Sequence, residues 1–364
     1  MHDFMMDKLS PKTGKRWINA ALFCCSFLVA FLALEIAVRL IVPTHIGVPS
    51  SLANYAAIPK PHDSRGLVIF NGELGWVNNP GASGHGRFHE YMSFDSMGFR
   101  NNDNKIKVKD RPVILAIGDS FTLGAEVGNA ETWPSRLEFK SGVKVLNGAV
   151  SGYGLDQMLT RTKSILDRRG IDVIIVAFFV EDIYRVREKK QYVLLKPYYS
   201  LENNQLVLHK VKAADYPRPD CFKKIFGYSY AVHLVMSKIF RDYWSKSSID
   251  SVEYADIDEA GVNYKIIDAF ADIAKSGQAK YIIFALLPGN AEDVSLTHHP
   301  LTDHIRNTGR KNNRVFLMDL QSKMKGNQSF FNDRAKGYHG HFSKQGNEFA
   351  AQEILSFLQT VKVY

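Results

Sequence analysis

Five short apolar runs that alternate with amphipathic stretches constrain the fold of this chain more than any other sequence feature. Runs that are apolar at nearly every position are typical of strands in a parallel sheet that is covered on both faces. The runs span residues 113–117, 143–147, 173–179, 281–287 and 314–319, and the helical stretches span 132–139, 155–169, 262–274, 301–312 and 344–358. This alternation predicts an α/β domain in which a parallel sheet lies between two helical layers.

One insertion interrupts the alternation after the third predicted strand, at residues 183–259. It contains a predicted hairpin that turns at Asn203 and Asn204, followed by an aromatic-rich helical stretch at 228–244. In α/β proteins, elements at the carboxyl edge of the sheet contact substrates. The aromatic side chains of the insertion either stack on sugar rings or pack in a core, and the sequence leaves both open.

The N-terminal region contains 18 consecutive residues without a charge, from position 17 to 34. As a helix they measure about 27 Å at about 1.5 Å per residue, close to the roughly 30 Å hydrocarbon thickness of a bilayer. Glu35 and Arg39 follow one turn apart and can pair near the interface. The positive-inside bias places the N-terminus in the cytoplasm and the bulk of the chain outside. The basic residues before the run are Lys8, Lys12, Lys15 and Arg16.

These features divide the chain into a cytoplasmic tail at 1–16, a transmembrane anchor at 17–42, a stalk and irregular lead-in at 43–110, and the sheet domain at 111–364. Two other interpretations of the apolar run fit less well. A cleaved signal peptide has a shorter apolar core and a small-residue cleavage site. A lipoprotein has a small residue directly before the lipidated cysteine, whereas Phe23 precedes Cys24.

Composition excludes several classes of protein. The 364 residues include 45% hydrophobic and 23% charged side chains, as in globular proteins, so a wholly disordered chain is excluded. Lys and Arg number 46 against 37 Asp and Glu, which gives a diffuse net charge of +9 without a nucleic-acid-binding motif. We therefore expect no nucleic-acid partner. The three cysteines cannot build a disulfide framework.

Polar clusters follow the predicted strands at the edge where such sheets carry their chemistry. The first strand runs directly into GDSFTLG at 118–124, and a serine at such a strand-to-helix turn points its hydroxyl into the crevice. Asp and Ser after a strand are also ordinary helix N-caps, so this cluster alone does not show whether Asp119 and Ser120 have a catalytic or a structural role. Because the carboxyl ends of parallel strands share one edge, the other clusters converge with it. They are NGAVSGYG at 147–154 after the second strand, FVEDI at 179–183 after the third strand, and HGHFSKQG at 339–346 just before the last predicted helix.

With these motifs in place, the sequence resembles the SGNH or GDSL hydrolase family, and in particular its single-pass, membrane-anchored bacterial members. The resemblance covers residues from about 74 to the C-terminus and includes LGW at 74–76 and MGFR at 97–100. It implies a three-layer, flavodoxin-like α/β/α fold. It also implies that Ser120 is the nucleophile and His341 the base, while the amides of Ser120 and Gly152 contribute to the oxyanion hole.

Two positions depart from the pattern of this family. Its third block carries an oxyanion-donating Asn followed by Asp, whereas this chain has Glu181 and Asp182, and an ionised Glu181 cannot donate a hydrogen bond. Loss of one such donor costs about 10²- to 10³-fold in rate. The family also has Asp two or three residues before the catalytic His, where this chain has His339 and no acidic residue. Either Asp333 orients His341 through a longer loop, or the site works as a Ser–His dyad held by a backbone carbonyl.

The resemblance implies an enzyme that cleaves or transfers acyl esters, above all acetyl esters, of envelope or exported polysaccharide. It implies the inner membrane of a bacterium, with the catalytic domain periplasmic or extracellular. The expected partners are the membrane, the acylated polymer and the envelope polysaccharide machinery. The departures at Glu181 and His339 favour a different class of protein, a glycan-binding or assembly subunit that keeps the fold but has no enzymatic activity. The candidate supporting residues are Asp119, Asp182, Asp333 and His339.

Cofactor sites have weaker signals in the sequence. The histidines at 85 and 89, 298 and 299, and 339 and 341 complete no recognisable metal-ligand set. The Ser- and Thr-rich first loop resembles a flavin-phosphate cradle in composition, but no second flavin loop accompanies it. We therefore expect neither a metal nor a cofactor.

A basic run either binds an anionic polymer or forms a solvated face. It consists of Arg185, Arg187, Lys189 and Lys190.

Overall fold

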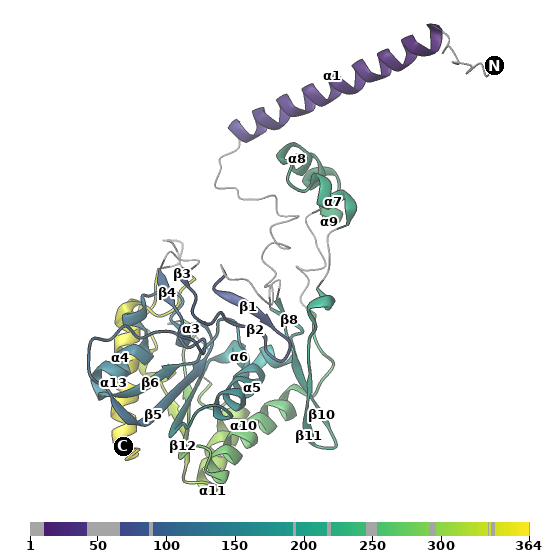
Figure 1. The fold of residues 1–364 in the computed structure, drawn as a ribbon. Helices are drawn as coiled ribbons and strands as arrows, with labels where there is room; N and C mark the ends of the chain where they lie inside the picture. Colours follow the sequence, from purple (N-terminus) through teal and green to yellow (C-terminus); the bar gives the residue numbers. More distant parts are fainter. Residues whose placement is uncertain are drawn as a thin grey trace, which may run out of the picture. The chain divides into compact units, whose positions relative to one another are not determined.

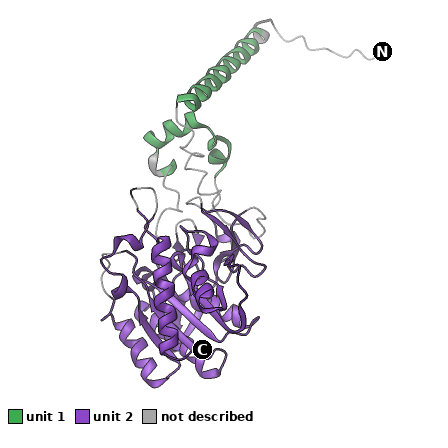
Figure 2. Cartoon of the chain, turned by 90° about the vertical axis from the view of Figure 1, so that its left-hand side faces the viewer, with its two compact units in different colours: residues 1–58, 217–251 green, residues 59–216, 252–364 purple. Residues whose placement is uncertain are grey.

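The computed structural model describes residues 11–41, 66–86, 90–191, 194–216, 220–244, 253–290, 296–333, 335 and 339–363. The chain falls into two compact units (Figure 2). The small unit comprises residues 1–58 and 217–251, and the large unit comprises residues 59–216 and 252–364. Residues 43–65 of the stalk and lead-in predicted at 43–110, and the first ten residues of the predicted tail, lie outside the described residues.

A five-stranded, fully parallel sheet forms the centre of the large unit (Figure 1). Its strands follow the order β13-β12-β7-β5-β6. They are β5 (Lys109–Gly118), β6 (Val143–Asn147), β7 (Val173–Phe178), β12 (Tyr281–Leu286) and β13 (Val315–Asp319). All five predicted strands are confirmed. Along the chain this is the strand order of flavodoxin-like sheets, in which the winding direction reverses between the first and third strands. The reversal point therefore lies between β5 and β7.

Helices cover both faces of this sheet, because the side chains of its strands alternate between two apolar cores. The face that carries Ile114 and Ala116 packs against α4 (Trp133–Ser141) and α13 (Lys344–Thr360). The face that carries Leu115 and Ile117 packs against α5 (Leu155–Leu166), α10 (Glu259–Ser276) and α11 (Pro300–Lys311). Figure 1 shows these layers on either side of the strands. The predicted three-layer α/β/α class is confirmed.

The described part of the lead-in packs against the sheet domain and belongs to the large unit. Its antiparallel pairs are β1 (Val68–Asn71) with β2 (Gly75–Asn78), and β3 (Ser83–His85) with β4 (Tyr91–Ser93). Trp76 is buried, and its Nε1 donates to the Ser151 carbonyl over 2.9 Å. The Tyr153 hydroxyl donates to the Trp76 carbonyl over 2.5 Å. The lead-in thereby fixes the loop after β6.

The insertion is shared between the two units. Its first part contains β8 (Lys190–Gln191), β9 (Leu194–Leu195) and the predicted hairpin of β10 (Tyr198–Glu202) and β11 (Gln205–His209). Asn203 and Asn204 form the hairpin turn with φ of 49° and 63°, a left-handed conformation that asparagine tolerates. A buried ion pair between Lys196 and Asp156 of α5 holds this part on the large unit.

The second part of the insertion joins the N-terminal helix in the small unit. The described helices of that unit are α1 (Pro11–Ile41), α7 (Cys221–Phe226), α8 (Tyr230–Ile239) and α9 (Arg241–Trp244). Within α1, residues Lys15–Ile41 are long and apolar enough to cross a bilayer. The stretch predicted as helical at 228–244 forms α8 and α9. The remaining short helices are α3 (Ser120–Leu123), α6 (Val180–Tyr184) and α12 (Gln321–Met324), with 3₁₀ turns at Asn129–Glu131, Arg185–Arg187, Ala213–Asp215 and Gln328–Phe330.

Candidate active site

Ser120 lies at the reversal point of the sheet, directly after β5. It begins the one-turn helix α3, whose N-cap Asp119 accepts a hydrogen bond from the Phe121 amide over 2.9 Å. Gly124 ends this turn with a φ of 77°, a conformation that strains any residue with a Cβ atom. Ser120 also lines a cavity of about 330 Å³. The local sequence GDSFTLG therefore places a hydroxyl at the carboxyl edge of the sheet, as its motif predicts.

His341 connects Ser120 to a carboxylate that the sequence did not indicate. Its Nε2 lies 2.8 Å from Ser120 Oγ, and its Nδ1 lies 2.7 Å from Glu126 Oε1. An ionised carboxylate only accepts hydrogen bonds, so Nδ1 carries the proton and Nε2 can accept a hydrogen bond from the serine hydroxyl. The three side chains therefore have the connectivity of a Ser–His–acid triad.

The Glu126 carboxylate is completely buried and accepts four hydrogen bonds. Oε1 accepts from the His339 amide over 2.6 Å and from His341 Nδ1, while Oε2 accepts from the His341 amide over 3.2 Å and from Asn332 Nδ2 over 3.1 Å. Burial raises the pKa of Glu126, but the hydrogen bonds and the charge of His341 outweigh it, so the net pKa is below its ordinary value. Glu126 is therefore held ionised.

The sequence had pointed to Asp333 or to a backbone carbonyl as the partner of His341. Asp333 is exposed in the structure, and its Oδ1 accepts from the Ala335 amide over 2.9 Å. Glu126 lies only six residues after Ser120, on the loop between α3 and α4. The only sequence feature that could have pointed to Glu126 is that it is a single carboxylate between two apolar residues, Ala125 and Val127.

Two backbone amides at the cavity are suited to bind an oxyanion. Among the described residues, neither the Ser120 amide nor the Gly152 amide donates a hydrogen bond to the protein, and both residues line the cavity. Gly152 has a φ of 80°, and a Cβ atom there would lie 3.1 Å from Gln191 Cγ. Only glycine therefore fits this position without strain. This arrangement fits the oxyanion role that the resemblance implied for both amides.

The third block of the motif places a different side chain at the cavity from the one that the resemblance implied. Glu181 is exposed on α6 and does not line the cavity, whereas Arg185, one turn later, does. Arg185 Nη1 lies 3.4 Å from Asp119 Oδ2 and also pairs with Asp182. Both carboxylates are completely buried. Burial, and then the charge of Asp119, raise the pKa of Asp182 well above its ordinary value.

The His339 side chain lines the same cavity as Ser120 and His341, but it does not belong to the hydrogen-bond chain that joins Ser120, His341 and Glu126. It is exposed, it lines the cavity, and its ring stacks near that of His341 at 6.5 Å between centroids. Its backbone amide, rather than its ring, contributes to the triad by donating to Glu126. His339 therefore takes the sequence position of the family's aspartate without taking its role.

Arg100 of the lead-in holds the loop that carries Glu126. Its buried guanidinium donates to the carbonyls of Leu123, Gly124 and Val127 over 2.7, 2.5 and 2.6 Å. It also donates to the Asn129 side chain over 3.0 Å. Burial lowers the pKa of Arg100 to about 10, which leaves it charged at neutral pH. The backbone is therefore fixed on both sides of Glu126.

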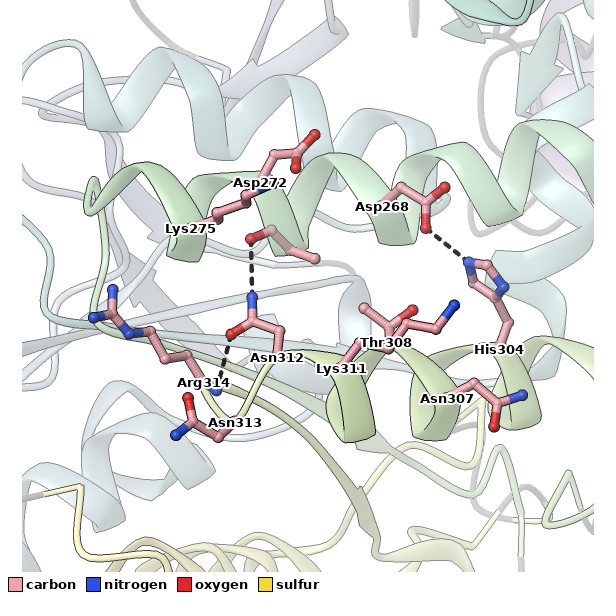
Figure 3. A pocket seen from close by; sticks show the side chains of 11 residues that line it. Asp268, Asp272, Lys275, His304, Asn307, Thr308, Lys311, Asn312, Asn313 and Arg314 are labelled. Carbon is pink, nitrogen blue, oxygen red and sulfur yellow. Dashed lines mark hydrogen bonds and ion pairs between the residues drawn. The ribbon is translucent and has the colours of Figure 1, made fainter.

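A second hollow, between α10 and α11, lies at the opposite edge of the sheet (Figure 3). Its lining includes Arg314, which directly precedes β13 and so marks the amino ends of the strands. Its groups pair with one another, as His304 does with Asp268 over 2.8 Å. Among the described residues, no group of three or more His, Cys, Asp or Glu side chains is placed to hold a metal ion. His89, one of the histidines noted in the sequence, lies outside the described residues.

Comparisons with known proteins identify structural neighbours. No protein-family model and no curated protein sequence matches the chain. A lipolytic protein of the G-D-S-L family from Desulfitobacterium hafniense is 13% identical, covers 70% of this chain and 100% of its own, and has a TM-score of 0.35. The family of this first neighbour is the one that the sequence motifs resemble.

Two further neighbours are an acetylxylan esterase and a carbohydrate esterase. A catalytic mutant of an acetylxylan esterase from Geobacillus stearothermophilus is 13% identical, covers 70% of this chain and 96% of its own, and has a TM-score of 0.36. A family 2 carbohydrate esterase from Corynascus thermopiles is 13% identical, covers 74% of this chain and 75% of its own, and has a TM-score of 0.39. These likenesses are distant, so the chemistry of the site is inferred from its own side chains.

Proposed function

We propose that the large unit is a serine ester hydrolase or O-acyltransferase. The observation that carries this proposal is the continuous hydrogen-bond chain from Ser120 through His341 to Glu126, at distances of 2.8 and 2.7 Å. A serine hydroxyl becomes a nucleophile when an adjacent base takes its proton, and the base works best when a third group fixes its ring. A binding subunit that had lost catalysis would have no need of this arrangement.

In the proposed reaction, Ser120 Oγ attacks the ester carbonyl carbon while its proton passes to Nε2 of His341. The carbonyl oxygen becomes negative and is stabilised by the amides of Ser120 and Gly152. The imidazolium then returns the proton to the leaving alcohol oxygen as the carbon–oxygen bond breaks, which leaves an acyl-serine. Water or a sugar hydroxyl attacks the acyl-serine by the same route, releasing an acid or a new ester and regenerating Ser120.

The proposed substrates are acyl esters, above all acetyl esters, of envelope or exported polysaccharide, an assignment that rests on the sequence resemblance. The lining of the cavity suits such a substrate because it combines apolar side chains for an acyl group with polar ones for sugar hydroxyls. The apolar group includes Met92, Phe94 and Leu123, and the polar group includes Arg185, Gln191 and His339.

We further propose that α1 is an uncleaved anchor in a bacterial inner membrane, with its N-terminus cytoplasmic and the large unit periplasmic or extracellular. Support comes from Glu35 of α1, which accepts hydrogen bonds from the Ser229 hydroxyl over 2.7 Å and from the amides of Tyr230 and Ala231 over 3.0 Å each. Removal of α1 as a signal peptide would leave the start of α8 without this cap. The envelope polysaccharide machinery is the proposed partner.

A fluorophosphonate probe tests the proposed chemistry, because it modifies only an activated serine. The wild type should be labelled, whereas Ser120→Ala and His341→Ala should lose both labelling and turnover of a short-chain aryl acetate. Ser151→Ala, at an exposed serine that lines the same cavity, is the matched control and should still be labelled. An unlabelled wild type that is retained on acetylated polysaccharide would instead support the glycan-binding subunit.

A further inference from the structure

Exposed apolar side chains are concentrated in the part of the insertion that belongs to the small unit. Outside α1, nine large exposed apolar residues lie within residues 220–244, against four in the described part of the large unit. The nine are Phe222, Ile225, Phe226, Tyr228, Leu234, Val235, Ile239, Phe240 and Tyr243, and Ile225 and Ile239 are 70% and 66% exposed. A surface of this kind normally marks a contact with a partner or a membrane.

The helices α7, α8 and α9 form one ordered cluster despite this exposure. Trp244 is 0% exposed, and its Nε1 donates to His233 Nδ1 over 2.9 Å. Its ring contacts Phe222 edge-on, with 6.1 Å between centroids. The Tyr243 hydroxyl donates to Asp220 over 2.8 Å, which ties α9 to the start of α7. Three short helices enclose too little volume to bury the other apolar side chains, so these need an apolar medium outside the cluster.

The end of α1 sets the depth at which this cluster lies. Glu35 directly follows the uncharged run of α1 and caps α8 through the hydrogen bonds described above. Arg39 pairs with Glu35 over 2.7 Å, donates to the Tyr228 carbonyl over 3.2 Å and lies over the Tyr230 ring at 5.1 Å. Figure 1 shows α8 beside the end of α1. If the uncharged run spans the hydrocarbon core, the start of α8 lies at the outer interface.

The remaining chemistry of the cluster fits a lipid headgroup layer. Lys224 of α7 and Lys238 of α8 are exposed and can reach anionic headgroups. Tyr228 and Tyr243 are partly exposed aromatic residues of the type that concentrates at membrane interfaces. Apolar side chains combined with lysines and tyrosines are characteristic of helices that lie in the interfacial plane.

We propose that residues 220–244 dock on the outer leaflet of the same bilayer that α1 spans, with the exposed apolar side chains among the headgroups and upper acyl chains. This inference rests on the proposed anchor and adds a second membrane contact to it. Because the chain passes between the small and large units at three points, near residues 58, 217 and 251, the large unit is then linked to the membrane surface by three chain segments. Its substrates are accordingly expected near that surface.

Depth-dependent quenching in the full-length chain tests this docking. In a background in which Cys24, Cys25 and Cys221 are replaced by alanine, Ile239→Cys carries a fluorophore, in vesicles of phosphatidylethanolamine and phosphatidylglycerol with brominated lipids. Phe139→Cys, at a 54% exposed position of the large unit, is the matched control, and a chain that retains only Cys24 reports on α1. We expect lipid quenching at positions 24 and 239 and none at 139.

The outcomes separate the docking from the anchor. Quenching at position 24 without quenching at 239 would overturn the docking and leave the anchor standing, while no quenching at 24 would refute the anchor and, with it, the docking. Disulfide crosslinks between two chains at Ile239→Cys, without lipid quenching, would assign this surface to a second copy. Glu35→Ala should reduce quenching at 239 and leave position 24 unchanged, whereas Leu32→Ala should alter neither.

Discussion

The two oxygens of Glu126 each accept two hydrogen bonds, and this symmetry makes the residue hard to replace. Oε1 accepts from the His339 amide and from His341 Nδ1, while Oε2 accepts from the His341 amide and from the Asn332 side chain. A glutamine offers one oxygen and one NH₂ group, so in either orientation two donors face another donor. The imidazole then loses its fixed tautomer or its orientation.

We therefore expect Glu126→Gln to lower kcat by about 10³- to 10⁴-fold, as substitution of the triad acid does in serine proteases. Turnover of an aryl acetate by the purified full-length chain measures this effect. Glu131→Gln, on the same loop but paired with Lys344 at the surface, should leave kcat unchanged. An equal loss in both variants would show that the loop tolerates no substitution and that Glu126 has no specific role.

The same carboxylate should make stability depend on acid pH. The pKa of Glu126 is lowered by folding from an ordinary value of 4.5, so its stabilisation is fully present above that pH and is lost as the pH falls through the lower folded pKa. The free energy of unfolding of the wild type should fall more steeply below pH 4.5 than that of Glu126→Gln. Urea titrations at several pH values measure this difference, and parallel curves for the two proteins would contradict it.

The oxyanion site offers a contrast between Arg185, which lines the cavity, and Glu181, which does not. Charge that develops beside Ser120 would be stabilised by the guanidinium, so Arg185→Met should lower kcat by about 10²-fold. Glu181→Asn restores the family residue at an exposed position of α6 and should leave kcat unchanged. Steady-state turnover of the two variants shows whether residue 185 or residue 181 stabilises the oxyanion. A higher kcat in Glu181→Asn would place the side chain at position 181 beside the oxyanion instead.

Between elements, the lead-in holds the loop that carries Glu126. Arg100 precedes the first strand of the sheet and binds three carbonyls on the loop between α3 and α4. The burial of Arg100 is compatible with its charge because each of the hydrogen bonds described above ends on an oxygen that needs a donor. The part of the chain predicted as an irregular lead-in therefore supports the active site.

Arg100→Met should destabilise the protein by at least about 2 kcal/mol, because buried acceptors lose their donors. It should also slow fluorophosphonate labelling of Ser120 at temperatures where the variant is still folded, since Glu126 is no longer held. Arg136→Met removes a half-exposed arginine from α4 and serves as the control for both measurements. A stability loss with an unchanged labelling rate would restrict Arg100 to a role in folding.

At the scale of the whole molecule, the chain separates a helical small unit from a large unit that contains the candidate active site. Large exposed apolar side chains belong almost entirely to the small unit among the described residues. The large unit buries its own core on both faces of the sheet, whereas the small unit does not bury its apolar surface. This distribution is the one expected of a soluble enzyme that is tethered to a bilayer.

A reporter that is active only in the periplasm, fused after residue 60, should therefore give activity, because the basic residues precede the apolar run and the remaining chain is translocated. A reporter that is active only in the cytoplasm should stay silent at the same position. The opposite pair of results would place the large unit in the cytoplasm and remove the proposed envelope substrate. Fusion of both reporters before residue 16 provides the reciprocal control.

Much of this protein follows from its sequence, because the relevant patterns are local. The apolar runs predicted the five strands of the sheet within one or a few residues at each end, and Asn203 and Asn204 marked the hairpin turn. The polar motifs were expected to converge because the carboxyl ends of parallel strands meet at one edge, and the resemblance to the SGNH family singled out Ser120, Gly152 and His341 among them. None of these inferences required knowledge of how distant segments pack.

The tertiary structure alone decided which carboxylate is hydrogen-bonded to His341 and which side chain near the third block lines the cavity. Glu126 reaches His341 because Arg100 and Asn332, far apart in sequence, hold its loop and its carboxylate. Arg185 reaches the cavity because α6 turns Glu181 outward. Side-chain direction and loop path depend on packing between segments far apart in the sequence, such as Glu126 and His341, which are 215 residues apart. No local periodicity records such contacts.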